Sequence, residues 1–340
     1  MIVEKDRQLG QMKKAQESTS SGWLNNVTIS GAVELETSYN SPYTGDSTSD
    51  ATVATAEIGI EAQVHDWVSA QITLLHEEDD TSLEVVSASF TIGPPEGNWS
   101  LTAGQIVVPF GAYESNMISD PLTLEVGEAK ETAIQLSFNN GGFSGSVYAF
   151  NGANKDGGDN HIDNFGASIG YAMESENNSF AFGLGYINDI GDSDNLQSTV
   201  STTLGSANIS DHVGGWAANA SVTFGPFALI GEYLSAFDNF EANEVVFNGR
   251  GAEPSAWHVE AAYNFNVGGK DATFAVSYQG TDEALALEQP EQRIMVGLSV
   301  GLFENVGLAF EWAHDEDYSV ADGGTGNTAN TVTGQIAVGF

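Results

Sequence analysis

Apolar and polar residues alternate with a period of two along nearly the whole chain after its first 22 residues. In residues 57–64, Ile58 and Ile60 fall on one face, and Glu57 and Glu61 fall on the other. Side chains of a β-strand point alternately to its two faces, so this pattern predicts strands with one apolar and one polar face. The alternating segments are residues 26–39, 57–64, 67–77, 83–92, 99–107, 131–138, 143–151, 162–174, 179–189, 213–224, 226–237, 257–266, 271–281, 291–301, 306–313 and 330–340.

The connections between these segments are alternately short and long. The seven short ones hold the Gly, Asn, Pro and Asp residues that tight turns require, and the eight longer ones are mostly acidic. Short turns on one side, long loops on the other and an even strand number are typical of membrane β-barrels, whereas a soluble sandwich gives no reason for such sorting. The short turns are 65–66, 93–98, 139–142, 174–178, 225–226, 267–271 and 302–305. The long loops are 40–52, 78–82, 108–130, 152–161, 190–212, 238–254, 282–290 and 314–329.

Composition supports a barrel in a membrane. Charged residues make up 16% of the chain, below the roughly 25% of a soluble domain, and glycine is abundant, with 39 residues. No run of 18 apolar residues is present, so the sequence offers no transmembrane helix. The chain ends in an alternating strand whose final Phe340 resembles the aromatic assembly signal of outer-membrane barrels. We therefore expect an all-β fold, a transmembrane antiparallel β-barrel of 16 strands in the bacterial outer membrane.

The first residues differ from the rest of the chain. Residues 1–20 hold four of the nine basic residues, and Leu9 and Met12 have the spacing of a helix. A short periplasmic helix and a disordered tail fit this segment equally well. The expected organisation is an N-terminal periplasmic helix or linker at 1–22 and a transmembrane barrel at 23–340. Because charged residues follow Met1 where a signal peptide would be apolar, we expect a mature or truncated form.

A barrel of 16 strands leaves a water-filled channel, whose selectivity depends on its polar face. The chain carries nine Lys and Arg residues against 47 Asp and Glu, a net charge of −38, which excludes nucleic acid as a partner. Solvation explains each acid by itself, but acids lining a cleft as a set raise the local cation concentration and predict cation preference. The expected pore-lining residues are Glu34, Glu36, Glu57, Glu61, Glu232, Glu260, Arg293 and Glu311.

The sequence shows no pattern typical of an enzyme or a specific metal site. It has no Cys, and its six His residues are scattered, with no HExxH motif and no triad. Acidic stretches at 77–80, 156–163, 189–195 and 315–324 resemble calcium ligands but lack the spacing of an EF-hand. We expect no catalytic residues, no resident cofactor and no specific metal site. Weakly bound divalent cations in the acidic loops remain the alternative.

The loop at 108–130 is long and mixes apolar with acidic residues. Counting connections makes it the third external loop, the one that folds inward and narrows the channel in classical 16-strand porins. We expect it to form a constriction; an external cap packed on neighbouring loops is the alternative. Apolar side chains would hold it to the wall, and Pro109 and Pro121 would stiffen it. The apolar residues are Met117, Ile118, Leu122 and Leu124. The expected constriction residues, of which the acids would face water, are Glu114, Asp120, Glu125, Glu128 and Lys130.

Residues 104–138 and 142–152 resemble the LbtU-type siderophore porins. The resemblance implies an outer-membrane porin for small solutes with a link to iron-siderophore uptake, in contact with lipid and lipopolysaccharide. It brings no catalytic residues with it. By analogy with classical porins we expect a homotrimer, and a mainly structural anchor for a periplasmic partner or the cell wall is the alternative function. The matching elements are Gln105, Val-Pro-Phe-Gly at 108–111, the run 115–125, Gly127, Glu128 and the run 146–152.

Overall fold

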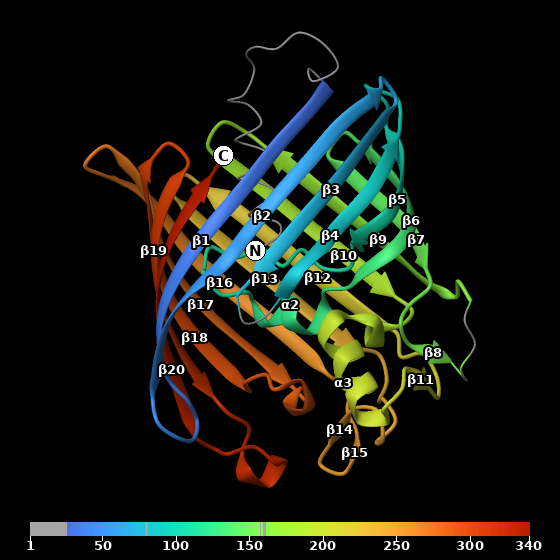
Figure 1. The fold of residues 1–340 in the computed structure, drawn as a ribbon, viewed down its shortest axis with the longest axis vertical. Helices are drawn as coiled ribbons and strands as arrows, with labels where there is room; N and C mark the ends of the chain where they lie inside the picture. Colours follow the sequence, from blue (N-terminus) through green and yellow to red (C-terminus); the bar gives the residue numbers. More distant parts are fainter. Residues whose placement is uncertain (1–25, 79–80, 157, 159–160) are drawn as a thin grey trace.

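The computed structural model describes residues 26–340 except 79–80, 157 and 159–160. Sixteen antiparallel strands form a closed barrel, in which β1 pairs with β20 to complete the wall (Figure 1). The predicted all-β barrel of 16 strands is therefore confirmed. The expected periplasmic segment at 1–22 lies outside the described residues. Within the described part of the chain, no helix has the length and apolar character needed to cross a membrane.

The wall strands follow one another around the barrel in chain order, interrupted only by short strands within the loops. The wall consists of β1 (Val27–Ser41), β2 (Thr48–His65), β3 (Val68–Glu77), β4 (Thr81–Ile92), β5 (Trp99–Val107), β6 (Lys130–Asn140), β7 (Phe143–Phe150), β9 (Asn164–Glu174), β10 (Asn178–Ile187), β12 (Gly215–Phe224), β13 (Phe227–Ala236), β16 (Ser255–Val267), β17 (Lys270–Asp282), β18 (Gln292–Phe303), β19 (Val306–Glu316) and β20 (Thr328–Gly339).

The loops carry small elements that the alternating pattern did not predict. The helix α3 is amphipathic, with Leu196 and Val200 buried one turn apart, and it ends at Gly205 in a left-handed conformation with φ 65°. The loop elements are α2 (Leu122–Gly127), η2 (Ile190–Asp192), α3 (Asp194–Leu204), η3 (Leu285–Leu287), η4 (Val320–Asp322), the parallel pair β8 (Lys155–Asp156) and β11 (Asn208–Ile209), and the antiparallel pair β14 (Val246–Phe247) and β15 (Arg250–Gly251).

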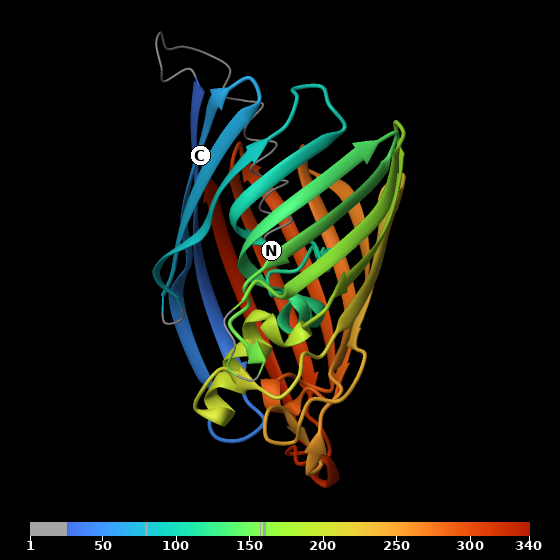
Figure 2. The same cartoon turned by 90° about the vertical axis from the view of Figure 1, so that its right-hand side faces the viewer.

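Tight turns join the strands at one end of the barrel, and the long loops gather at the other (Figures 1 and 2). Gly141 and Gly142 both have positive φ, as do Gly268 and Gly269, which is the conformation that two-residue hairpin turns need. Strand β2 begins at Thr48, nine residues before its predicted start. Its first half alternates small residues with only Val53 as a large apolar one, so the period of two is weak there.

The outer face of the wall is apolar and the inner face is polar. Ile29, Val33 and Leu35 of β1 are each nearly half exposed on the outside, although they are large and apolar. Aromatic pairs occur near both ends of the barrel, for example Phe227–Tyr263 beside a tight turn. An apolar outer band flanked by aromatic residues is the surface that lipid requires of a transmembrane barrel.

The hydrophobic core lies within the loops at the long-loop end and beneath them. It joins Val108, Phe110 and Val126 of the β5–β6 loop to Leu196 of α3 and Leu234 of β13. A barrel wall in lipid needs no such core, because its apolar face is turned outward. The packing here therefore serves to fix the loops, and above all the loop between β5 and β6.

Candidate functional site

The loop between β5 and β6, residues 108–129, extends into the barrel. Its short helix α2 lies within the ring of strands in both views (Figures 1 and 2). Contacts join α2 to β13, β16 and β17, which are far from β5 and β6 around the wall. We call residues 108–129 the inward loop.

Glu232 of β13 holds the first part of the inward loop. Its carboxylate accepts hydrogen bonds from the backbone amides of Ala112 at 2.7 Å and Tyr113 at 3.0 Å, and from the Thr123 hydroxyl at 2.8 Å. Only 5% of Glu232 is exposed. The carboxylate thus satisfies amides that an irregular segment leaves without partners, and such charge-assisted bonds are the stronger kind.

Glu260 of β16 holds the next turn in the same way. It accepts from the Ser115 hydroxyl at 2.9 Å and from the Asn116 backbone amide at 3.0 Å. The Asn116 side-chain amide adds a bond of 2.6 Å. His258 lies beside this carboxylate, with its Nε2 3.5 Å from a Glu260 oxygen.

Two further side chains of the wall also accept hydrogen bonds from the inward loop. Glu311 of β19 accepts from the backbone amide of Ile118 at 2.6 Å and from the Ser119 hydroxyl at 2.6 Å. Gln279 of β17 accepts from the backbone amide of Leu122 at 2.7 Å. Side chains from four strands of one side of the wall therefore bind successive turns of the inward loop.

Apolar packing and glycines bring the inward loop close to the wall. Leu122 and Val126 are fully buried and Ile118 is 9% exposed. Leu124 is partly buried and packs against the same core, so the predicted anchoring by apolar side chains holds for Ile118, Leu122 and Leu124. A β-carbon at Gly185 of β10 would lie 1.9 Å from the carbonyl oxygen of Phe110. No side chain fits at that distance, so Gly185 permits the close approach.

The residues just before and within α3 cover the end of the inward loop. The Ser193 hydroxyl donates to the Val126 carbonyl at 2.8 Å, and the Asp194 amide donates to the Glu128 carbonyl at 2.8 Å. The Asn195 side chain donates to a Glu125 carboxylate oxygen at 2.8 Å. The loop between β10 and β12 therefore stabilises the inward loop from the outside.

The expected constriction residues occupy different environments. Glu114, Asp120 and Glu125 are partly exposed. Glu128, expected to face water, is only 8% exposed, because the turn before α3 covers it. Burial raises the pKa of Glu128 to about 7, which nearby Lys130 opposes and Asp194 reinforces. Lys130 lies 3.6 Å from a carboxylate oxygen of Asp194 and 3.9 Å from one of Glu84.

The expected pore-lining residues divide into two sets. Glu232, Glu260 and Glu311 lie beneath the inward loop and bind it, instead of facing open water. The other acids lie on β1 and β2, and Gln335 of β20 donates to Glu36 at 2.8 Å. Arg293 forms a two-pronged pair with Asp315, at 2.7 and 3.0 Å. The acids on β1 and β2 are Glu34, Glu36, Glu57 and Glu61.

The sequence could not reveal the loop-binding role of the wall acids. Alternation places Glu232, Glu260 and Glu311 on the polar face but does not identify partners 109 to 193 residues away. The role of Gly185 could not be predicted either, because glycine is common throughout the chain. The one usable signal was the length and mixed character of the inward loop itself.

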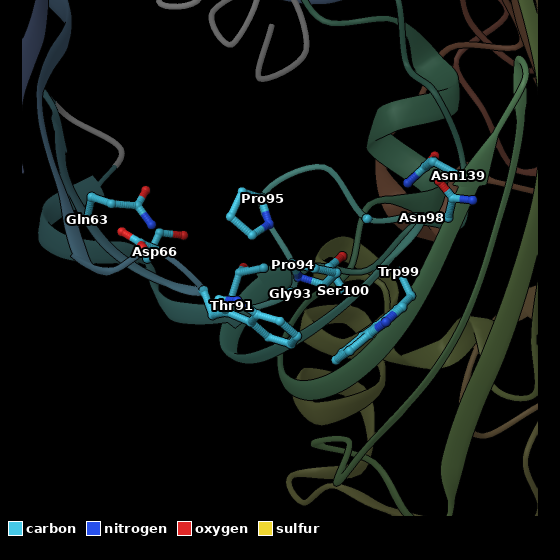
Figure 3. Close-up of a pocket in the computed structure, with 13 residues that line it drawn as sticks. Gln63, Asp66, Thr91, Gly93, Pro94, Pro95, Asn98, Trp99, Ser100 and Asn139 are labelled. Atoms are coloured by element: carbon cyan, nitrogen blue, oxygen red, sulfur yellow. The ribbon is translucent and has the colours of Figure 1, made fainter.

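A separate hollow of about 640 Å³ lies at the tight-turn end of β3, β4 and β5. Figure 3 shows Gln63 and Asp66 on one side of it and Trp99 with Ser100 on the other. Pro94 and Pro95 of the β4–β5 turn lie between them (Figure 3). None of its lining residues belongs to the inward loop, so the hollow is a separate feature of the barrel. Among the described residues, no three Asp, Glu or His side chains are arranged to hold a metal ion.

By sequence, the chain is similar to UPF0422 proteins of two bacteria. It is 31% identical to a UPF0422 protein of Coxiella burnetii over 306 residues, covering 86% of this chain and 65% of that protein. It is 28% identical to a UPF0422 protein of Legionella pneumophila strain Paris over 351 residues, covering 92% of this chain and 66% of that protein. The chain thus spans just under two thirds of the length of these relatives. No protein-family model matches it.

Solved structures of the same fold are outer-membrane proteins. The outer-membrane channel DcaP of Acinetobacter baumannii matches with a TM-score of 0.63 and 15% identity, over 92% of this chain and 97% of that one. An anion-selective porin from Comamonas acidovorans matches with a TM-score of 0.62 and 14% identity, over 92% and 99%. OmpT of Vibrio cholerae in its trimer form matches with a TM-score of 0.53 and 13% identity, over 93% and 100%.

These likenesses concern the fold, and they agree with the expected location in the bacterial outer membrane. The chain is a 16-strand barrel with the fold of outer-membrane porins, and its relatives by sequence are UPF0422 proteins.

Proposed function

We propose that this protein is a water-filled channel for small hydrophilic solutes, constricted by the inward loop and selective for cations. The observation that carries the proposal is the row of wall side chains, Glu232, Glu260, Gln279 and Glu311, that holds the loop inside the barrel. A barrel of this strand number is too wide to be filled by its wall side chains. A loop fixed across the interior is therefore what sets the narrowest passage.

Charge supports cation preference. Partly exposed Glu114, Asp120 and Glu125 lie on the inward loop, and further acids lie on β1 and β2. Among the described residues, Lys130 near the loop is paired with Asp194, and Arg293 is paired with Asp315. Because a low-dielectric wall strengthens the field of a chain with 47 acidic and only nine Lys and Arg residues, cations are concentrated and anions repelled.

Reversal potential in a KCl gradient across a planar bilayer tests this function. The expected sign is that of preferential K⁺ permeation, and the preference should weaken at high salt, where charges are screened. A reversal potential of the opposite sign would refute the electrostatic proposal. The anion-selective porin with the same fold is no counter-evidence, since 14% identity carries the fold and not the charges.

The proposal also concerns the transported solute and the oligomeric state. The resemblance of residues 104–138 and 142–152 to the LbtU-type siderophore porins supports a link to iron-siderophore uptake. A decrease in the K⁺ current when a ferric siderophore is added would reveal this link. The fold shared with the trimer form of OmpT supports a homotrimer, surrounded by lipid and lipopolysaccharide. Light scattering of the detergent-solubilised protein distinguishes one from three chains. A structural anchor, the alternative role, predicts no conductance.

A further inference from the structure

Three buried polar side chains join two of the external loops. Asp189 and Asp192 lie in the loop after β10, and Asn154 lies in the loop after β7. Asp189 and Asp192 are fully buried, and Asn154 is 2% exposed. Acidic residues are rarely buried this deeply without a charged partner.

Most of the polar atoms in this cluster have a hydrogen-bond partner. One Asp192 oxygen accepts from the Asn154 backbone amide at 2.9 Å, and the other accepts from the side-chain amide of Asn164. Oδ1 of Asp189 accepts from the backbone amide of Gly191 at 2.9 Å. The Asn154 side-chain amide nitrogen donates to the Gly191 carbonyl at 2.7 Å. These bonds fix the orientation of Asp189 and Asn154.

Two oxygen atoms in the cluster are buried and have no hydrogen-bond partner, Oδ2 of Asp189 and Oδ1 of Asn154. The two side chains flank the same glycine: a β-carbon at Gly191 would lie 2.9 Å from Oδ1 of Asp189 and 3.0 Å from Nδ2 of Asn154, the bonded atoms of the two groups. Leaving a buried acceptor unsatisfied costs roughly 1–3 kcal/mol, and more when it is charged. Two such acceptors in one hydrogen-bonded cluster point to a ligand that has not yet been counted.

The surroundings favour a cation as that ligand. Glu244, 1% exposed, adds a third buried carboxylate, and its oxygens accept from the backbone amides of Ser210 and Glu241. Lys155 is directed elsewhere, to Asn151 at 2.8 Å.

We propose that Oδ2 of Asp189 and Oδ1 of Asn154 bind a calcium ion that fastens the β7–β9 loop to the β10–β12 loop. Both donors are oxygens, and calcium accepts carboxylate, amide and backbone oxygens together with water in a flexible geometry, whereas Mg²⁺ demands near-ideal octahedra. The described part of the chain has no group of three acidic or histidine ligands here, so main-chain oxygens or water complete the shell. The site goes beyond the channel function and does not depend on it.

The location gives the ion a structural consequence. Asp192 is followed directly by Ser193 and Asp194, which donate hydrogen bonds to the end of the inward loop. Calcium bound beside Asp189 would therefore stabilise the turn that covers Glu128. External calcium is in this way linked to the rigidity of the inward loop.

Calorimetric titration of the refolded, lipopolysaccharide-free protein with CaCl₂ after EDTA treatment tests the site. One ion per chain is expected, with a dissociation constant of about 0.1–1 mM, the range of extracellular calcium modules. Asp189→Asn should weaken binding at least tenfold. Asn154→Asp, which keeps the oxygen and adds a charge, should retain or strengthen it, and Asp238→Asn, in an exposed position of another loop, is the matched control.

Three outcomes would overturn the proposal: no calcium binding by the native chain, equal binding by Asp189→Asn, or weaker binding by Asp238→Asn to the same degree. A fourth measurement separates a cation from a proton. If Asp189→Asn raises the thermal midpoint in EDTA and calcium never shifts it in the native chain, then Asp189 carries a proton and no metal.

Discussion

Glu232 and Tyr113 are 119 residues apart in the sequence, yet the Tyr113 amide donates to the Glu232 carboxylate at 3.0 Å inside the barrel. The same carboxylate accepts two further hydrogen bonds from the inward loop. An acid that the alternating pattern places on the polar face thus fixes the backbone of a distant loop. Acceptors on the wall therefore hold the inward loop in addition to apolar packing.

Removing this acceptor should loosen the loop. Glu232→Ala leaves two backbone amides without partners and is expected to cost roughly 3 kcal/mol of local stability. Hydrogen exchange at Ala112 and Tyr113 measures it, and exchange should accelerate about a hundredfold. Glu304→Ala, in an exposed tight turn, should change nothing. Unchanged protection in Glu232→Ala would show that the wall carboxylate is dispensable.

Apolar packing contributes separately to the stability of the inward loop. Leu122, in helix α2 of the inward loop, is fully buried, so Leu122→Ala is expected to lower the free energy of unfolding by about 2–5 kcal/mol through the cavity it leaves. Leu83, 70% exposed on the outside of β4, is the comparison. Denaturant unfolding in detergent measures both variants. A loss at Leu83 as large as the loss at Leu122 would contradict the packing described here.

Gly185 tests the close approach of loop and wall. Gly185→Ala places a β-carbon 1.9 Å from the Phe110 carbonyl, so the loop must shift, at a cost of about 1–3 kcal/mol. Gly307→Ala meets no atom within 4 Å and is the matched control. Single-channel recording should show altered conductance only for Gly185→Ala. Identical currents from the two variants would mean that the loop does not bear on the passage.

The stability of the inward loop should fall as pH rises from about 4.5 to 7. Burial raises the pKa of Glu128 from 4.5 to about 7, so the folded loop favours the protonated carboxyl. The penalty is absent below pH 4.5 and complete above pH 7, where it reaches about 3 kcal/mol. Hydrogen exchange of the loop at pH 5 and pH 8 measures it. Glu128→Gln should abolish the pH dependence, whereas Glu114→Gln should retain it; a slope that survives Glu128→Gln assigns it to another group.

Much of the wall could be predicted from the sequence because its signals are local. The period of two can be recognised within each strand, and each tight turn contains its own glycines and asparagines. Residues such as Ile58 and Gly141 could therefore be placed without knowing which distant residues they contact. The position of the inward loop followed from counting connections.

The contacts of the inward loop could not be predicted in this way. The role of Glu260 depends on the amide of Asn116, 144 residues earlier, and no local pattern relates the two. The expectation that Glu128 faces water was wrong for a similar reason. The turn that buries Glu128 lies about 65 residues later in the sequence, just before α3, a helix that the period-two pattern did not predict. Alternation indicates which face of a strand is polar. Whether the side chains on that face are buried depends on which segments, distant in the sequence, pack over them.

Selectivity should depend on the inward loop more than on the outermost loops. Asp120→Asn or Glu125→Gln is expected to lower the K⁺ over Cl⁻ permeability ratio more than Asp317→Asn or Asp322→Asn, because a charge acts most strongly where the passage is narrowest. The reversal potential in a salt gradient gives the ratio for each variant. Equal effects at both places would refute the assignment of the loop as the selective element.

Thiol modification of the inward loop tests the constriction most directly. The chain contains no Cys, so a single introduced cysteine is the only reactive thiol. Current through Glu114→Cys is recorded before and after a bulky methanethiosulfonate reagent, with Glu304→Cys at a tight turn as the control. The account predicts that the reagent cuts the single-channel conductance of Glu114→Cys by half or more and leaves Glu304→Cys unchanged. Confirmed labelling of Glu114→Cys with no change in conductance would contradict it.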